Sequence, residues 1–534
     1  MKQMETPAAV TPVKAGAPLP PAPDTGEPAS GALRPGAVVG GAAFTLIANY
    51  GASLVNLSVT VVLAHNLGPT GMGVVAAALL TVEMIDTVRN LGLREALIYE
   101  PDLDRRYFNA AFLVILAVAL LQALCMVAAG IAGAALGMEP RLAHLLPWLA
   151  LIFPLTALGT PQEAMLARQG RFIRRASAEL LNVAVKAVVA IALIELGWGI
   201  AGLVAGMLAG VVARAVYLWV RSTWRPALRR PAAEILLTLY RYGRHIVFVN
   251  LLSLLRAKAD QYLVAALLMP SALGTYYLAA RIPEMAIFAA NVSITNVVFP
   301  TFAHIAREGG RAGRPEDLGA AYIRAIRAAM LLMVPVSLGI AATSLPIVEV
   351  LFGARFDQAA PILAVLALGG IPLTLGWSSG DVFKATGRPH LLTAVTLIEV
   401  GLAIPVLALA ILFIHDLRWV AAAMVACETA SCLVRLRFMA RYEGVGIGET
   451  LRAVAPSLLA GVLMAALVLG AGLHLQPLAP ALRLALLIAL GAAVYAGLIL
   501  ALDRGSVAEL RLLLRRVPPA PDAPPAPDAP AAQG

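Results

Sequence analysis

Stretches of about twenty mostly apolar residues, separated by short polar segments, run through the chain from residue 37 to residue 502. A helix rises about 1.5 Å per residue, so about 20 apolar residues cross a hydrocarbon core about 30 Å thick. The pattern therefore predicts about 14 transmembrane helices. They are expected at 37–64, 72–93, 108–137, 142–165, 176–197, 200–221, 243–268, 272–298, 323–346, 360–384, 389–414, 417–438, 453–474 and 479–502.

The overall composition agrees with this pattern. Apolar residues make up 60% of the chain and charged residues 13%, against about 45–50% and about 25% in typical soluble domains. Too little polar surface remains for a soluble particle, so we expect an all-α integral membrane protein. The formal net charge of +10 is explained by basic cytoplasmic loops, and no nucleic-acid partner is expected.

The basic residues orient the predicted helices. Most of the 41 lysines and arginines fall in the two terminal tails and in the loops after even-numbered helices. Because basic residues collect in cytoplasmic loops, both termini are expected in the cytoplasm. The tails, 1–36 and 517–534, are rich in proline and alanine and are expected to be disordered.

Two short segments indicate an internal repeat. The segment LGPTGMGVV, from Leu67, follows the first predicted helix, and LMPSALGTY, from Leu268, follows the seventh. Both contain proline and glycine four residues apart, and a Gly-Arg pair precedes helix five (170–171) and helix eleven (387–388). Helices six apart have the same orientation, which predicts two six-helix lobes in a parallel repeat, with two further C-terminal helices. These three parts are expected at 37–221, 243–438 and 453–502.

Several segments also carry a resemblance to a known family. Between about residues 40 and 440 the chain resembles polysaccharide flippases of the O-antigen and exopolysaccharide type. These belong to the multidrug/oligosaccharidyl-lipid/polysaccharide exporter superfamily. The segments concerned are VVLAHNLGPTGMGVVAAAL, RNLGLREALI, RYGRHIVFVNLLSLLRAKADQYLVAALLMPSALGTYYLAAR, Phe299-Pro300 and LFGARFDQAAPILAVLAL.

The resemblance implies a function and its partners. Such proteins move undecaprenyl-diphosphate-linked oligosaccharides from the inner to the outer leaflet of the bacterial cytoplasmic membrane, for surface polysaccharides such as lipopolysaccharide and exopolysaccharide. The expected partners are the lipid-linked glycan, the lipid bilayer, a polysaccharide polymerase and the export machinery. No catalytic residue, metal or cofactor is expected, and the protein is expected not to be an enzyme.

Charged residues in the middle of predicted helices are the candidate site. Arg256 lies about 20 Å into its helix, past the middle of the bilayer, and Lys258 and Asp260 follow within four residues. A charge facing lipid there costs from about 2.5 to over 10 kcal/mol. These side chains are therefore expected to face a partner or a wet cavity. Arg281 and Glu284 lie at a similar depth in the next helix.

Cations outnumber carboxylates in the middle of the fifth to eighth predicted helices. Because unpaired buried cations are strongly destabilising, we expect a cavity that admits an anion. Arginine and lysine both bind phosphate well. With the resemblance, this predicts that Arg256, Lys258 and Arg281, with Lys186 across the lobe interface, bind the substrate's diphosphate. Internal ion pairs, Arg256 with Asp260 and Arg281 with Glu284, are the alternative interpretation.

Four carboxylates and one arginine within predicted spans are candidates for coupling to an ion gradient or for gating. The candidate residues are Glu83, Asp86, Arg89, Asp260 and Glu284. A carboxylate there could exchange a proton or a sodium ion for substrate. Local pairing with Arg89 or Arg256 is the alternative. No nucleotide-binding P-loop occurs in the sequence.

Two other functions fit the sequence less well. A cation-coupled multidrug exporter of the same superfamily would have a carboxylate in its first helix or two and would bind cationic substrates. The first helix here has only Asn49 and Asn56 as polar amides and no acidic residue. A membrane-embedded glycosyltransferase or polymerase would need a base or paired carboxylates, usually beside a large outer loop, whereas the outward loops here are short.

Overall fold

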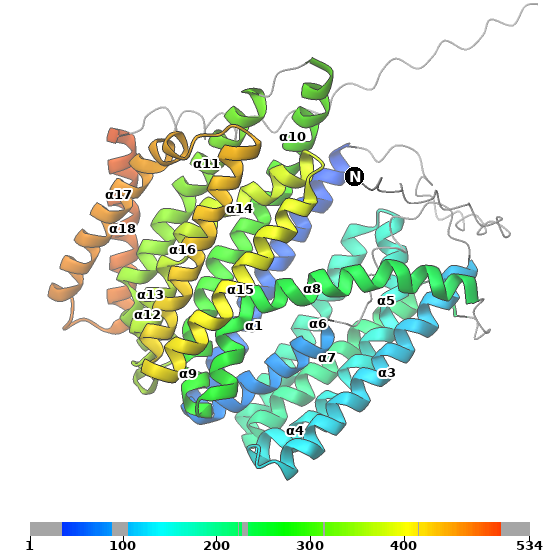
Figure 1. Cartoon of the computed structure of the whole chain (residues 1–534). Coiled ribbons are helices and arrows are strands. Elements are labelled where there is room, and N and C mark those ends of the chain that lie inside the picture. The colour runs from blue at the N-terminus through cyan, green and yellow to red at the C-terminus, as the bar shows by residue number, and fades with distance from the viewer. Residues whose placement is uncertain are drawn as a thin grey trace, which may run out of the picture. The chain divides into compact units, whose positions relative to one another are not determined.

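The chain is helical throughout its described part (Figure 1). The computed structural model describes residues 35–87, 105–222, 224–226, 233–312, 316–414 and 416–502. These ranges contain no strand, and 11 segments in them are long and apolar enough to cross a membrane. The all-α, multi-pass membrane architecture is confirmed. The two predicted tails lie outside the described residues, apart from the first helical residues at 35 and 36.

The 11 segments are compatible with about 14 helices. The long helix α1 (Pro35–Asp86) covers the first predicted helix and most of the second, joined across a kink at Gly68, where φ is 66° and ψ is −177°. Glycine tolerates this positive φ, and the following Pro69 disfavours a helical conformation at the residue before it. The seventh and eighth predicted helices correspond to α8 (Ala233–Leu267) and to α9 with α10. Their charged residues make them less apolar than the other spans.

The described helices form two compact units, each with its own contacts. Unit 1 contains Val82–Leu193 and Ala201–Leu251, and unit 2 contains α1 up to Thr81, Ile194–Ile200 and the chain from Leu252 onward. The lobe boundaries expected from the sequence stay a prediction. Unit 1 includes α3 (Arg105–Ala135), α4 (Pro140–Leu149), α5 (Ile152–Arg168), α6 (Phe172–Leu193) and α7 (Ile200–Arg221).

Unit 2 includes the larger number of helices. After α8 these are α9 (Pro270–Pro283), the π-helical turn η2 (Glu284–Phe288), α10 (Ala289–Ala312), α11 (Glu316–Ala342), α12 (Ser344–Leu351), the 3₁₀ turn η3 (Ala354–Phe356), α13 (Ala359–Leu368), α14 (Gly370–Ala385), α15 (Pro389–Ile414), α16 (Leu417–Tyr442), α17 (Ile447–His474) and α18 (Pro480–Leu502). The last two lie side by side (Figure 1).

The two C-terminal helices pack on α11 within unit 2. The hydroxyl of Tyr495 on α18 donates to the carbonyl of Leu331 on α11 at 2.9 Å. On α17, a Cβ added at Gly461 would stand 2.4 Å from a Val334 methyl of α11. Such a close approach requires glycine, so α17 and α18 are integral parts of unit 2.

The internal repeat is visible in a reciprocal contact. A Cβ added at Gly73 would stand 1.7 Å from the Pro270 carbonyl oxygen, and one added at Gly274 would stand 2.1 Å from the Pro69 carbonyl oxygen. Each Pro-x-x-x-Gly segment therefore packs its glycine against the proline of the other. The contact lies within unit 2 and explains why both segments need glycine at the same place.

The Gly-Arg pairs form a second matching feature. Gly170 ends α5 with φ 68° and Gly387 ends α14 with φ 74°. The next amide, of Arg171 or Arg388, bonds the carbonyl five residues earlier at 2.9 Å and 2.8 Å respectively. This is the glycine-terminated helix end described by Schellman. Equivalent positions of the two halves thus fold in the same way.

Candidate functional site

Helix α8 carries three charged residues within five positions inside unit 2. The side chains of Arg256 and Lys258 are 18% and 15% exposed, and Asp260 is 4% exposed. Because all three are largely buried, each needs partners from neighbouring helices.

Arg256 belongs to a chain of alternating charges across α8, α15 and α16. Its guanidinium lies 3.8 Å from Glu399 and 3.4 Å from Glu428. Arg435 donates two bonds to Glu399, from Nε at 2.6 Å and from Nη2 at 3.0 Å. Arg256 therefore pairs with carboxylates from distant helices, Glu399 on α15 and Glu428 on α16.

Two glycines of α14 provide the room for Arg435. A Cβ added at Gly376 would stand 3.0 Å from Cδ of Arg435, and one added at Gly380 would stand 3.9 Å from its Nη1. The arginine therefore reaches Glu399 along the surface of α14. Larger residues at Gly376 would crowd its side chain.

A second group of charges centres on Glu284, the first residue of the π-helical turn. Lys258 Nζ lies 2.6 Å from its Oε1, and Arg281 Nη1 lies 3.7 Å from its Oε2. The amide nitrogen of Gln261 donates to Oε1 at 2.7 Å. The pairing of Arg281 with Glu284 that the sequence offered as an alternative is thus present, with Lys258 sharing the same carboxylate.

Asp260 occupies a different position. The hydroxyl of Tyr276 on α9 donates to its Oδ2 at 2.7 Å. Its other oxygen, Oδ1, is buried without a hydrogen-bond partner, and so is Oε1 of Gln261. Both orphaned atoms are acceptors, so the site lacks hydrogen-bond donors or a cation at this point.

A cavity of about 130 Å³ lies beside several of these charged residues. That volume has room for several water molecules. Its polar lining comes from Arg256, Asp260, Gln261, Glu284 and Glu428. The remaining lining is mostly apolar and includes Ile287, Phe288, Leu366, Leu373 and Met424. The cavity lies within unit 2.

The charged residues around α8 are not dominated by cations, in contrast to the charges that the sequence places on the fifth to eighth predicted helices. Helices α15 and α16 add Glu399, Glu428 and Arg435 to this cluster. The cluster as a whole then contains cations and carboxylates in equal number: Arg256, Lys258, Arg281 and Arg435 against Asp260, Glu284, Glu399 and Glu428. Ion pairing accounts for much of the buried positive charge that the sequence left unexplained.

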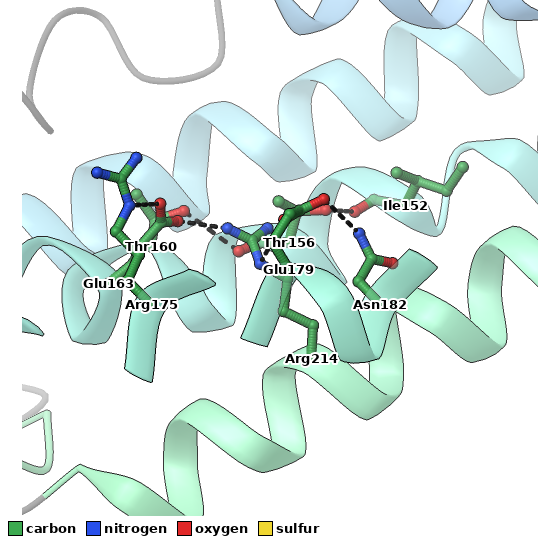
Figure 2. A network of polar contacts seen from close by, with 8 residues as sticks. All are labelled: Ile152, Thr156, Thr160, Glu163, Arg175, Glu179, Asn182 and Arg214. Carbon is green, nitrogen blue, oxygen red and sulfur yellow. Dashed lines mark hydrogen bonds and ion pairs between the residues drawn. The ribbon is translucent and has the colours of Figure 1, made fainter. Parts of the chain in front are cut away.

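Unit 1 contains a separate charged network, drawn in Figure 2. Glu163 on α5 accepts from Arg175 on α6 at 2.9 Å and from Arg214 on α7. Arg214 also lies 3.4 Å from Glu179 on α6, which accepts from Asn182 at 3.1 Å. Glu163 was not among the sequence candidates because it lies near the inner end of its predicted span.

The remaining predicted site residues lie elsewhere. Lys186 is on α6 in unit 1, where α7 packs closely: a Cβ added at Gly210 would stand 3.0 Å from the Lys186 Cβ. Glu83 and Asp86 lie at the end of α1, also within unit 1. Arg89 lies outside the described residues. The structure therefore brings together Arg256, Lys258, Asp260, Arg281 and Glu284, and places Lys186, Glu83 and Asp86 in a different unit.

Comparison with known proteins supports the fold and the family. A model of the polysaccharide biosynthesis protein family matches residues 62–361, more than half of the chain. The chain is 27% identical over 310 residues to the succinoglycan biosynthesis transport protein ExoT of Rhizobium meliloti (strain 1021), covering 58% of this chain and 61% of that protein. It is 22% identical over 389 residues to the lipopolysaccharide biosynthesis protein WzxC of Escherichia coli (strain K12), covering 70% and 74%.

Solved structures share the architecture. The lipid II flippase MurJ in an inward closed conformation matches with a TM-score of 0.68 at 13% identity, covering 88% of this chain and 99% of that one. An inward-facing multidrug resistance transporter of the MATE family matches with a TM-score of 0.61 at 16% identity, covering 74% and 94%. At these identities the likeness concerns the fold alone. Together with the family match over residues 62–361, it confirms the resemblance expected from the sequence, and the chain belongs to the polysaccharide biosynthesis protein family.

Proposed function

We propose that the protein is a flippase that moves a lipid-diphosphate-linked oligosaccharide from the inner to the outer leaflet of the bacterial cytoplasmic membrane, for surface polysaccharide synthesis. The names of ExoT and WzxC support a role in this class of pathway. The observation that carries the proposal is the convergence of Arg256, Lys258 and Arg281 on two carboxylates, Glu284 and Glu428, that line one cavity. Arginine and lysine are suited to bind the diphosphate.

The proposed mechanism is alternating access. Residues 37–221 and 243–438 would rock as two lobes around the substrate, with both termini in the cytoplasm, as the basic loops indicate. The protein would act as a transporter without catalysing a reaction. Undecaprenyl diphosphate is the proposed lipid carrier, and a polymerase is the proposed next partner. Lys186, Glu83 and Asp86 keep their predicted roles as candidates.

Reconstitution tests the proposal directly. Purified protein in liposomes that contain a prenyl-diphosphate-linked oligosaccharide should move the glycan between leaflets. The movement is measured as the fraction of glycan accessible to an added, membrane-impermeant glycosidase. Protein-free liposomes are the control. Equal accessibility in both preparations would contradict the proposed function.

A multidrug exporter is the second candidate. The observation that favours it is the set of carboxylates on the cavity wall, Asp260, Glu284 and Glu428, which would suit a cationic substrate. The same proteoliposomes, loaded with a cationic dye and given a proton or sodium gradient, separate the two functions. Dye efflux without glycan movement would favour the exporter.

A further inference from the structure

The cations proposed to bind the diphosphate are already occupied by carboxylates. Lys258 and Arg281 both contact Glu284, at 2.6 Å and 3.7 Å, and Arg256 contacts Glu428 at 3.4 Å. An arriving diphosphate must therefore compete with a carboxylate for the same N–H donors. If Glu284 stayed ionised, its negative charge would also repel the bound diphosphate, because both groups would lie in a poorly solvated place.

Among the carboxylates of this cluster, Glu284 is the one that an arriving diphosphate can displace most easily. Its side chain is 29% exposed, whereas that of Glu399 is 2% exposed. It begins a π-helical turn directly after Pro283, and such turns interrupt the regular helix and are frequent at functional sites. A change of side-chain rotamer would release Lys258 and Arg281 together. Nε of Arg281 is, in addition, buried without a hydrogen-bond acceptor.

A partner for a neutral Glu284 is also present. Gln261 donates its amide nitrogen to Glu284 at 2.7 Å, while its own Oε1 is buried without a donor. Asp260 Oδ1, on the same cavity wall, lacks a donor as well. A protonated carboxyl group supplies one O–H donor, and a carboxylate supplies none. Protonation of Glu284 would therefore satisfy an acceptor that is otherwise unsatisfied.

The charge balance favours the same event. The charged groups around Glu284 are Lys258, Arg281 and Asp260, with Tyr276 as a further titratable neighbour. Arg256 and Glu428 line the same cavity as Glu284 and Asp260. Three cations here face three carboxylates, so a bare diphosphate would leave an excess of negative charge. Uptake of one proton removes one of those charges and weakens the hold of Glu284 on Lys258 and Arg281.

We propose that the substrate's diphosphate binds by displacing Glu284 from Lys258 and Arg281, and that Glu284 takes up one proton from water as the diphosphate binds. This inference rests on the proposed function. It makes Glu284 a positioning residue that holds the binding cations when substrate is absent, and it makes diphosphate binding and proton binding a single event.

The test uses the full-length protein and inorganic pyrophosphate as the probe. Isothermal titration in buffers with different ionisation enthalpies counts the protons that accompany binding, between about pH 5.5 and pH 8. For one linked proton, the dissociation constant should fall by up to about tenfold per pH unit as the pH is lowered. Glu284→Gln, which resembles the protonated residue, should bind more tightly at high pH and lose one proton of uptake.

Two controls make the measurement specific. Glu284→Gln reports the protonation of pyrophosphate itself, which is subtracted from the wild-type value. Glu349→Gln removes a carboxylate that pairs with Arg483 at 3.9 Å away from the cavity lining, and it should behave as the wild type. If Glu284→Gln binds pyrophosphate and the wild type does not, the proposal is also supported, because the ionised carboxylate then blocks the site.

Two results would count against the proposal, and they differ in meaning. If the wild type and Glu284→Gln bind pyrophosphate with equal affinity and equal proton uptake, the role of Glu284 is wrong while the diphosphate site stands. If neither protein binds pyrophosphate at any pH, both the role of Glu284 and the proposed diphosphate site are wrong. The glycan-movement assay then decides separately whether the protein is a flippase.

Discussion

The charged networks of the two units are built in different ways. In unit 1, Glu163 on α5 accepts hydrogen bonds from Arg175 and Arg214 on the next two helices, and the network links α5, α6 and α7 (Figure 2). In unit 2, Arg256 on α8 reaches Glu399 on α15 and Glu428 on α16. The unit 1 network connects helices that follow one another in the sequence. The unit 2 network connects helices that are far apart in the sequence.

Their surroundings differ as well. The unit 2 network lines a cavity of about 130 Å³ and leaves acceptors of Asp260 and Gln261 without donors. Buried charge by itself therefore does not identify a binding site, because ion pairs that only support packing contain the same residue types. The distinguishing feature is the cavity, whose lining includes Asp260 and Gln261 with their orphaned acceptors.

The largest expected effect is the loss of Glu399. Glu399→Ala would leave Arg256 and Arg435 without a shared carboxylate, and breaking a buried ion pair in this way costs about 3–5 kcal/mol. Thermal unfolding of the purified protein in detergent should show a clearly lower midpoint, or the protein should fail to accumulate. Glu349→Ala, which removes a more exposed carboxylate, is the matched control. Equal midpoints for the two variants would contradict the account of this network.

A steric change in unit 1 should have an intermediate effect. A Cβ added at Gly206 on α7 would stand 2.6 Å from the Ala190 Cβ and 2.7 Å from the Lys186 carbonyl oxygen of α6. Gly206→Val should therefore overpack this contact and destabilise the protein by about 1–3 kcal/mol. Gly401→Val, where an added Cβ meets no atom within 4 Å, is the control in the same thermal assay. Similar destabilisation by both variants would show that loss of glycine, rather than crowding, is responsible.

The smallest effect is expected at Arg175. Its side chain is 37% exposed, and exposed ion pairs contribute about 0–1 kcal/mol. Arg175→Gln should leave both the unfolding midpoint and the rate of glycan movement close to the wild-type values. A strong loss of movement would show that the unit 1 network has more than a packing role.

The sequence predicted the architecture well because apolar length and Pro-x-x-x-Gly segments are local signals. The membrane-spanning helices followed from the first signal and the repeat from the last, as the reciprocal contact of Gly73 and Gly274 shows. The family resemblance pointed to the same class of fold.

The partners of the charges could not be predicted in the same way. Counting charges on the fifth to eighth helices left a surplus of cations, because Glu399, Glu428 and Arg435 come from helices that only the folded chain brings to α8. The pair Arg281–Glu284 was foreseen since its members are three residues apart on one helix face. The hydrogen bond from Tyr276 to Asp260 joins two helices and had no signal in the sequence.

The central claim is that the unit 2 cations around Glu284 and Glu428, and not the cations of unit 1, bind the substrate's diphosphate. The most direct measurement is glycan movement in proteoliposomes by Arg281→Gln and Arg281→Lys, at equal protein content, with Arg175→Gln as the unit 1 control. A charged hydrogen bond contributes about 1.5–3 kcal/mol, so the glutamine variant should lose roughly ten- to hundredfold in rate. Lysine should restore part of it, and Arg175→Gln should retain the wild-type rate. Wild-type movement by Arg281→Gln would contradict the claim.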